Sequence, residues 1–246
     1  RGILAAMPDC DVECVPVADG GDGLTEVMVQ ALSGRFIKST VKGPRMEPLS
    51  SLFCLVKEEK LAVIEMARAS GLALLSKDKQ DPTMTSTYGT GELIKAALDR
   101  GVRRIIVGLG GSATCDGGIG MASALGYKFL DKKGLEVVPT GGSLVQIQTI
   151  DTSEVDPRLQ NVLVEGVCDV TNPLTGPDGA SYVYSSQKGG TADQIKALDE
   201  GLENLARVIY RDLGLDIRRM AGAGAAGGLG GGLHAFLGAE LRKGID

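Results

Sequence analysis

The sequence has little of several residue types, and each shortage excludes a class of protein. Its 246 residues include no tryptophan, four phenylalanines and one histidine, His234. No apolar run approaches the ~18 residues that a membrane-spanning helix needs, and no basic stretch leads into an apolar core as in a signal peptide. We therefore expect a cytoplasmic protein with no membrane partner.

Cysteine and positive charge are also scarce. The five cysteines are widely spread and form no CxxC pair, so neither a disulfide framework nor a zinc knuckle is predicted. His234 lies in a run of small residues and is interpreted as structural, which disfavours triad chemistry. The net charge of −5 argues against a nucleic-acid partner, because such binding needs a basic face, but it leaves room for a local nucleotide site.

Glycine, in contrast, is abundant. The chain has 36 glycines, about twice the ~7% of average proteins, and they gather in loops rather than in a repeat. Hydrophobic residues make up 43% and charged residues 23% of the chain, as in globular proteins. The length allows one large domain or two ordinary ones.

Apolar runs alternate with helical patterns along the chain. Residues 102–109 have strand composition and lead through a glycine-rich loop to a short helical pattern at 119–125. A capping box of Thr191 and Gln194 precedes a long apolar helical stripe that ends at Gly214, and Thr90 is predicted to begin an earlier helix. This alternation predicts an α/β fold with a largely parallel sheet, and a hairpin at residues 36–56 suggests a mixed second sheet.

Three predicted strands are followed by acidic residues. Asp19 and Asp22 follow residues 12–17, Asp116 follows 102–109, and Asp169 follows 162–168. In open α/β sheets, ligands bind beyond the carboxyl ends of the strands. These acids are therefore candidates for a functional site.

The glycine-rich loop at residues 108–118 (GLGGSATCDGG) has the composition of an anion site. Glycines let main-chain N–H groups curl around an anion, and the following helix adds free amides. Ser112 and Thr114 can donate hydrogen bonds, and Asp116 can hold Mg²⁺ or accept a proton. The alternative is that the glycines form a tight turn and Asp116 caps the next helix.

The other candidates also have structural interpretations. Asp22 fits either a hydrated Mg²⁺ or the N-cap of the helix that begins at Leu24. Asp169 precedes a rigid turn with no helix to cap, which favours a functional use. Lys188 and Arg68, each among small residues, suit either an anion contact or a solvated surface.

Residues 222–227 (GAGAAG) fit the pattern GxGxxG, which signals a dinucleotide site only after a strand. The preceding residues 215–220 are charged and poor in strand character. Close helix packing or a phosphate loop is therefore favoured over NAD binding. The P-loop pattern GxxxxGK[ST] is absent from the sequence.

Seven motifs, taken in order, closely resemble those of the type I glycerate kinase family and cover nearly the whole chain. They are residues 18–23 (ADGGDG), 66–72 (MARASGL), 86–94 (STYGTGELI), 110–114 (GGSAT), 168–174 (CDVTNPL), 187–189 (QKG) and 222–230 (GAGAAGGLG). No single motif is diagnostic, but the ordered set is highly specific.

The resemblance implies a two-domain α/β architecture, a Rossmann-like domain with a large inserted mixed α/β domain, and an active site between them. Residues 1–37 would belong to the first domain, and residues 38–246 to the inserted domain and the start of the return. The family's amino-terminal strand and carboxy-terminal segment are missing from this chain, so the Rossmann-like domain is expected to be incomplete. Cys115 stands where the family usually has Asn, and Ala221 where it has Pro.

The resemblance also implies phosphorylation of glycerate by ATP with Mg²⁺, most often to the 2-phospho product; a homodimer is a possible assembly. The implied site has four parts: the phosphate-binding residues Gly110, Gly111, Ser112, Thr114, Gly222 and Gly224; the catalytic residues Asp169, Asp19 and Lys188; the glycerate ligands Arg68 and Asn172; and the Mg²⁺ ligands Asp116 and Asp22.

Two other functions stay open. The chain could be a catalytically inactive, ligand-binding part of such a kinase, which its missing ends suggest. It could also be a nicotinamide-dependent oxidoreductase that uses residues 222–227. Release of ADP on addition of glycerate separates the three.

Overall fold

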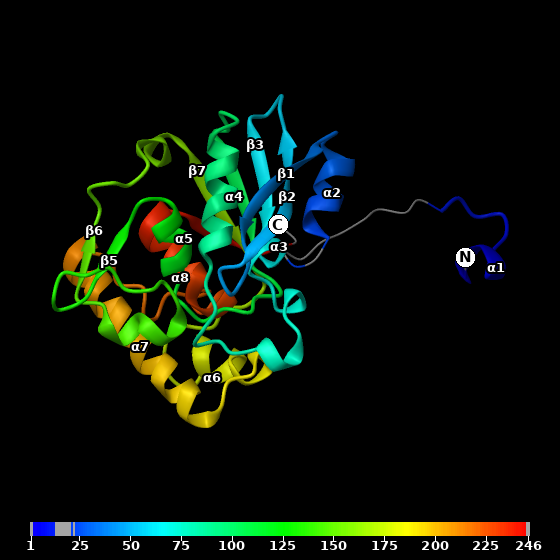
Figure 1. Cartoon of the computed structure of the whole chain (residues 1–246). Coiled ribbons are helices and arrows are strands. Elements are labelled where there is room, and N and C mark those ends of the chain that lie inside the picture. The colour runs from blue at the N-terminus through cyan, green and yellow to red at the C-terminus, as the bar shows by residue number, and fades with distance from the viewer. Residues whose placement is uncertain (1, 13–20, 22, 245–246) are drawn as a thin grey trace.

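The computed structural model describes residues 2–12, 21 and 23–244 (Figure 1). At its centre is a six-stranded sheet of order β1-β2-β3-β4-β7-β8, next to a two-stranded sheet of β5 and β6. The strands are β1 (Arg35–Lys42), β2 (Pro48–Val56), β3 (Leu61–Glu65), β4 (Arg104–Gly108), β5 (Lys128–Leu130), β6 (Thr149–Asp151), β7 (Leu163–Val167) and β8 (Glu240–Arg242).

The described residues also form eight α-helices. They are α1 (Gly2–Ala6), α2 (Leu24–Ala31), α3 (Ala67–Ser70), α4 (Tyr88–Leu98), α5 (Ile119–Ala124), α6 (Ala180–Tyr184), α7 (Ala192–Leu213) and α8 (Ala225–Leu237), with the 3₁₀ turns η1 (Leu72–Leu74), η3 (Gly141–Gln146) and η5 (Ser186–Lys188) among the connections. Among the helices of the described residues, none has both the length and the apolar character needed to cross a membrane. The mixed α/β class predicted from the alternation is confirmed.

The predicted hairpin does not form a second sheet. Strands β1 and β2 pair antiparallel as expected, but β2 also pairs antiparallel with β3, so the hairpin extends the main sheet. Strands β3, β4, β7 and β8 are parallel neighbours. Strand β2 is apolar on both faces, with Phe53 and Cys54 both fully buried, which is typical of a strand inside a sheet that is covered on both faces.

Alternate residues of the sheet enter two cores, as the two-residue period of a strand requires. Val63 and Ile106 pack in a cluster with Leu24 of α2. Ile64 and Val107 belong to the larger cluster on the other face, which contains α4, α5, α7 and α8. Figure 1 shows α2 and α4 on opposite sides of the strands. The sheet is thus covered on both faces.

Helix α4 begins earlier than predicted. It starts at Tyr88 after Thr87, whereas Thr90 lies within its first turn. The hydroxyl of Thr90 is fully buried and bonds the hydroxyl of Ser70 at 2.9 Å. Thr90 therefore connects α4 to α3 and does not cap a helix.

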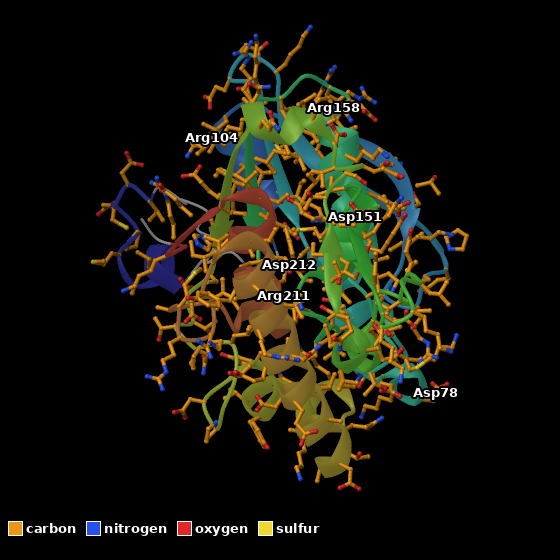
Figure 2. The ribbon with its side chains drawn as sticks, turned by 90° about the vertical axis from the view of Figure 1, so that its left-hand side faces the viewer. Asp78, Arg104, Asp151, Arg158, Arg211 and Asp212 are labelled. Atoms are coloured by element: carbon orange, nitrogen blue, oxygen red, sulfur yellow. The ribbon has the colours of Figure 1, made fainter. Side chains whose placement is uncertain are left out.

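Helix α7 has the ends that the sequence predicts. Thr191 and Gln194 form a reciprocal capping box, and Gly214 ends the helix at φ +75°. Near that end, the carboxylate of Asp212 accepts a hydrogen bond from the amide of Ile150 at 2.9 Å, which fixes α7 to β6. Figure 2 labels Asp212 and Asp151, the residue that follows Ile150 in β6. The long helix is thus anchored to the small sheet.

The segment before α8 forms a loop that leads into the helix, and the helix is kinked at its start. Ala226, Gly227 and Gly228 have left-handed conformations. The amide of Gly117 donates to the carbonyl of Gly227 at 3.1 Å, and a Cβ on Gly227 would lie 1.9 Å from the carbonyl oxygen of Thr114. The two glycine-rich segments of the sequence are therefore in direct backbone contact.

The predicted domain boundary between residues 37 and 38 falls within strand β1. Strand β1 is continuous across it and pairs with β2 from Arg35 to Lys42. The division into two domains stays a prediction.

Candidate anion-binding site

The carboxyl ends of three parallel strands meet at one edge of the sheet. Glu65 of β3, Gly108 of β4 and Val167 of β7 lie side by side in register. The loops that carry Asp116 and Asp169 therefore begin at the same edge, as predicted. Asp19, Asp22 and nearly all of the strand predicted at residues 12–17 lie outside the described residues.

The loop after β4 presents free amides. Gly111 takes φ +69°, a conformation that favours glycine. The loop is fixed to the segment after α3, because the amide of Leu72 donates to Gly111 and the amide of Ala113 donates to Ser70. Within the described part of the chain, the amides of Gly110, Gly111 and Ser112 have no hydrogen-bond partner. Free N–H groups in a glycine-rich loop are donors that an anion can use.

Lys188 brings a positive charge to this loop. It is only 2% exposed, and its Nζ donates to Ser112 Oγ at 2.8 Å and to the carbonyl of Thr114 at 2.7 Å. An ammonium has three donors, so one remains without a partner among the described residues. Burial lowers the pKa of Lys188 to about 8, because desolvation disfavours the charged form. A ligand oxygen that accepted the third hydrogen bond would offset this cost.

The free amides and Lys188 line one pocket of about 360 Å³. Its remaining walls are partly apolar and are formed by Leu72, Leu109, Val170, Tyr184, Gln187 and Ala226. A small set of convergent polar groups within apolar walls is typical of small-molecule sites. The predicted residues Gly110, Gly111, Ser112 and Lys188 thus come together at one site. Thr114 contributes its carbonyl to Lys188, and its own buried hydroxyl has no partner in the described structure.

Asp116 is oriented away from any metal role. It is fully buried, and its carboxylate accepts hydrogen bonds from the amide and hydroxyl of Thr87 and from the amides of Gly118 and Gly120. Burial raises the pKa of Asp116 although these hydrogen bonds oppose the shift. The geometry matches the capping interpretation, since Gly118 and Gly120 lie at the start of α5. The glycine loop is thereby fixed to the start of α4.

Arg68 is already paired. Its Nε donates to Glu65 at 3.0 Å, and it also forms an ion pair with Glu26 of α2. Glu65 in turn accepts hydrogen bonds from the amide and hydroxyl of Thr25. Two carboxylates thus neutralise the guanidinium that was predicted to bind a substrate carboxylate. Glu65 is not among the predicted site residues, although it is an acid within the apolar run 61–66.

A second pocket, of about 720 Å³, adjoins the first. It shares Leu72 and Gly111 with the Lys188 pocket and is also lined by Arg68, Glu65 and Gly23. Gly23 ends the acidic motif at residues 18–23. One end of that motif therefore lies near the glycine loop, as the site prediction requires.

Asp169 and Asn172 lie on the loop that follows β7. Asp169 is exposed, and its carboxylate accepts a hydrogen bond from the amide of Gly244 at 3.0 Å. Its neighbour Val170 lines the Lys188 pocket. Asn172 donates to the carbonyl of Asp178 and accepts from the hydroxyl of Tyr184. Asp169 is thus available to a ligand, whereas the side-chain nitrogen and oxygen of Asn172 both have hydrogen-bond partners within the protein.

The glycines of the GxGxxG pattern pack closely against other segments of the chain. A Cβ on Gly224 would lie 2.3 Å from the carbonyl oxygen of Pro173, and one on Gly222 would lie 3.0 Å from Leu241. The preceding residues 215–220 form no strand. The pattern therefore serves close packing, one of the two interpretations favoured from the sequence, and lacks the strand that NAD binding needs. His234 is structural as expected, since its ring nitrogen contacts the carbonyl of Ala239.

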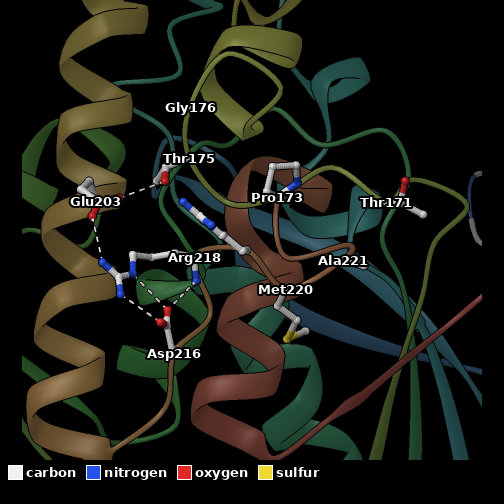
Figure 3. A pocket seen from close by; sticks show the side chains of 10 residues that line it. Thr171, Pro173, Thr175, Gly176, Glu203, Asp216, Arg218, Met220 and Ala221 are labelled. Atoms are coloured by element: carbon white, nitrogen blue, oxygen red, sulfur yellow. Dashed lines mark hydrogen bonds and ion pairs between the residues drawn. The ribbon is translucent and has the colours of Figure 1, made fainter.

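A larger pocket of about 960 Å³ is lined by residues 171–176 of the loop after β7, by Glu203 of α7 and by residues 216–221 (Figure 3). Arg218 in its wall pairs with Asp216 and Glu203, and Glu203 also accepts from Thr175. These contacts balance the charge of Arg218, whereas Arg219 in the same wall forms no ion pair among the described residues. Lys188 differs from both arginines because it is buried and lies beside three free amides.

The described residues contain no group of three or more His, Cys, Asp or Glu side chains arranged to hold a metal ion. Four cysteines in the described ranges, Cys10, Cys54, Cys115 and Cys168, are free thiols.

Comparison with known proteins adds a family to this geometry. A sequence model of the Glycerate kinase family matches residues 1–246. The chain is 50% identical to a glycerate kinase of Bacillus subtilis (strain 168) and 47% identical to a glycerate 2-kinase of Escherichia coli (strain K12), each over 246 residues. It spans 64% and 65% of the lengths of these relatives. It also superposes, over 99% of its length and 65% of the other chain, on the crystal structure of a protein assigned as glycerate kinase 2 from Salmonella typhimurium LT2, with a TM-score of 0.92 and 47% identity.

Proposed function

The chain belongs to the glycerate kinase family, and we propose that this protein transfers the γ-phosphoryl group of ATP to a hydroxyl of glycerate, giving a phosphoglycerate and ADP. The observation that carries the proposal is the Lys188 pocket, which is lined by a buried lysine and by three residues whose amides have no partner in the described structure. Phosphoryl transfer needs such groups, because catalysis consists mainly of positioning and of stabilising charge on the phosphoryl oxygens.

The amides of Gly110, Gly111 and Ser112 bind phosphate oxygens in this proposal. They are held in place because Leu72 and Ala113 fix the loop to the segment after α3. The loop thus needs no reorganisation when the phosphates bind, which is the condition under which dipoles stabilise developing charge best.

Lys188 supplies positive charge beside these amides. The hydroxyl of Ser112 and the carbonyl of Thr114 hold its Nζ in place and leave one donor for a phosphate oxygen. Its burial keeps water away, so that its charge acts at lower effective dielectric than at the surface.

Asp169 is the proposed acceptor of the proton of the glycerate hydroxyl. It is exposed at the carboxyl end of β7, one residue before Val170 in the pocket wall. Asp19, the other predicted candidate, belongs to the acidic motif whose end at Gly23 lines the adjoining pocket. We assign glycerate to this adjoining pocket, next to the phosphates.

Magnesium accompanies ATP in phosphoryl transfer, but the residues present do not fit its predicted site at Asp116. That carboxylate is fully buried and faces four hydrogen-bond donors. Asp116 instead positions the glycine loop. Asp22, the other predicted ligand, lies outside the described residues.

The decisive experiment couples ADP release to added glycerate in the full-length protein. The variant Lys188→Met should lower kcat/KM by ~10² or more if the ammonium stabilises phosphoryl charge, whereas Lys196→Met, which removes an exposed lysine on α7, should leave it unchanged. Wild-type protein that binds ATP or glycerate but releases no ADP would instead support the inactive, ligand-binding alternative.

A further inference from the structure

One aromatic ring lines the Lys188 pocket. Tyr184, the last residue of α6, lies in its wall together with Leu72, Leu109 and Val170. The sequence analysis did not single out Tyr184. Its position four residues before Lys188 was the available signal, because the short turn η5 keeps the two residues close together.

The ring of Tyr184 is fixed by hydrogen bonds. Its hydroxyl donates to Asn172 Oδ1 at 2.7 Å, and Asn172 Nδ2 donates to the carbonyl of Asp178 at 2.8 Å. The main chain of Asn172 is also held, because its carbonyl accepts from the amide of Gly224 at 3.0 Å. A chain of three partners thus orients the ring before any ligand binds.

The pocket combines two chemistries. Lys188 and the free amides suit phosphate oxygens, whereas the ring of Tyr184 and the aliphatic side chains offer apolar contact. Glycerate carries an oxygen on each of its three carbons and has no apolar face. A nucleotide has both a phosphate end and a flat base, and bases stack favourably on aromatic side chains.

We propose that Tyr184 contacts the nucleoside part of ATP in the Lys188 pocket, and that Asn172 is the positioning residue that orients its ring. This inference rests on the proposed kinase function. It gives Asn172, predicted as a glycerate ligand, an indirect role on the nucleotide side of the site.

The test compares two probes by calorimetry on the full-length protein: ATP, and inorganic triphosphate, which lacks the nucleoside. Tyr184→Ala should weaken ATP binding by between about fivefold and about a hundredfold and change triphosphate binding less than twofold. Tyr182→Ala, which removes an exposed ring from the same helix, should change neither.

A double-mutant cycle tests the role of Asn172. Tyr184→Phe keeps the ring and removes its hydroxyl, so it also tests the proposal should Tyr184→Ala fold poorly. Asn172→Ala should weaken ATP binding in the wild type. It should add little in the Tyr184→Phe background, because that variant has already lost the hydrogen bond between residues 184 and 172. Additive losses would contradict the positioning role.

The outcomes separate the two proposals. If Tyr184→Ala leaves ATP affinity unchanged, or weakens ATP and triphosphate equally, the nucleoside contact is refuted while glycerate-dependent ADP release can stand. If the wild-type protein binds neither probe, the proposed kinase function itself fails.

Discussion

The contact between the two glycine-rich segments leads us to predict how much Gly227→Ala lowers the free energy of unfolding. A Cβ at this position would lie 1.9 Å from the carbonyl oxygen of Thr114 and 2.7 Å from the Cα of Cys115, at a φ of +70°. Gly134 is a matched control, because it has a similar φ of +77° but no atom within 4 Å of the Cβ position.

The magnitude follows from the difference between the two sites. Both Gly→Ala changes pay ~1–2 kcal/mol for a left-handed alanine, and both reduce the freedom of the unfolded chain to the same extent. Only Gly227→Ala must also displace backbone, and overpacking of this kind costs ~1–3 kcal/mol. We therefore expect Gly227→Ala to lower the free energy of unfolding by about 2 kcal/mol more than Gly134→Ala, or ~4–8 °C in Tm.

Urea unfolding followed by far-UV circular dichroism measures this difference, since the sequence has no tryptophan to report by fluorescence. The Thr114 carbonyl also accepts a hydrogen bond from Lys188, so Gly227→Ala should lower kcat even at temperatures where it is folded. Equal destabilisation by the two variants would refute the close backbone contact on which the site geometry depends.

Three further changes test individual side chains. Asp116→Asn places an NH₂ group against buried N–H donors. It should lower the free energy of unfolding, measured by urea denaturation, by ~2–3 kcal/mol, whereas Asp193→Asn on the exposed face of α7 should not lower it. The pKa of Lys188 in the folded protein is about 8, below the ordinary 10.5. The kcat/KM should therefore fall as the pH rises through about 8, because Lys188 then loses its charge. In Lys188→Arg the fall of kcat/KM should move to higher pH. Between pH 8 and pH 10.5 the unfolded chain keeps the proton of Lys188 that the folded protein has lost. The free energy of unfolding of the wild type should therefore rise with pH in this range relative to that of Lys188→Met. Asp169→Asn should lower kcat by ~10²-fold if this acid accepts the hydroxyl proton; an unchanged kcat would remove it from that role.

Local signals in the sequence predicted much of the fold. The capping box at Thr191, the helix end at Gly214 and the apolar run before Gly108 each act within a few residues, and the structure confirms all three. The error at Thr90 has a different origin: a hydroxyl that could cap a helix is instead buried against Ser70 of another element. Sequence alone does not reveal which long-range partner competes for a polar side chain.

The hairpin shows the same limit at the level of the sheet. Its alternating, apolar strands predict antiparallel pairing, and β1 and β2 pair as expected. Whether the second edge of β2 pairs with another strand depends on residues 61–65, and this pairing cannot be read from the hairpin's own sequence. Strand type was therefore predictable, but sheet membership was not.

Charged residues at the site were the hardest to assign, because a carboxylate or guanidinium acts according to its partners. Asp116 and Arg68 both have the right residue type at the right strand end, yet Thr87 binds the first, and Glu65 and Glu26 neutralise the second. Lys188 is the opposite case, since its partners are neutral oxygens and its charge stays uncompensated by an ion pair in the described structure.

The glycines of the loop at residues 108–118 have different structural roles. Its glycines have two tasks that the sequence cannot separate: Gly110 and Gly111 leave amides free, whereas Gly117 lies against the turn at Gly227. The second task supports the first, because a loop held by backbone contact keeps its free amides fixed without a ligand. A side chain introduced at the packing positions should therefore impair anion binding from a distance, while one at Gly110 would act on the amides directly.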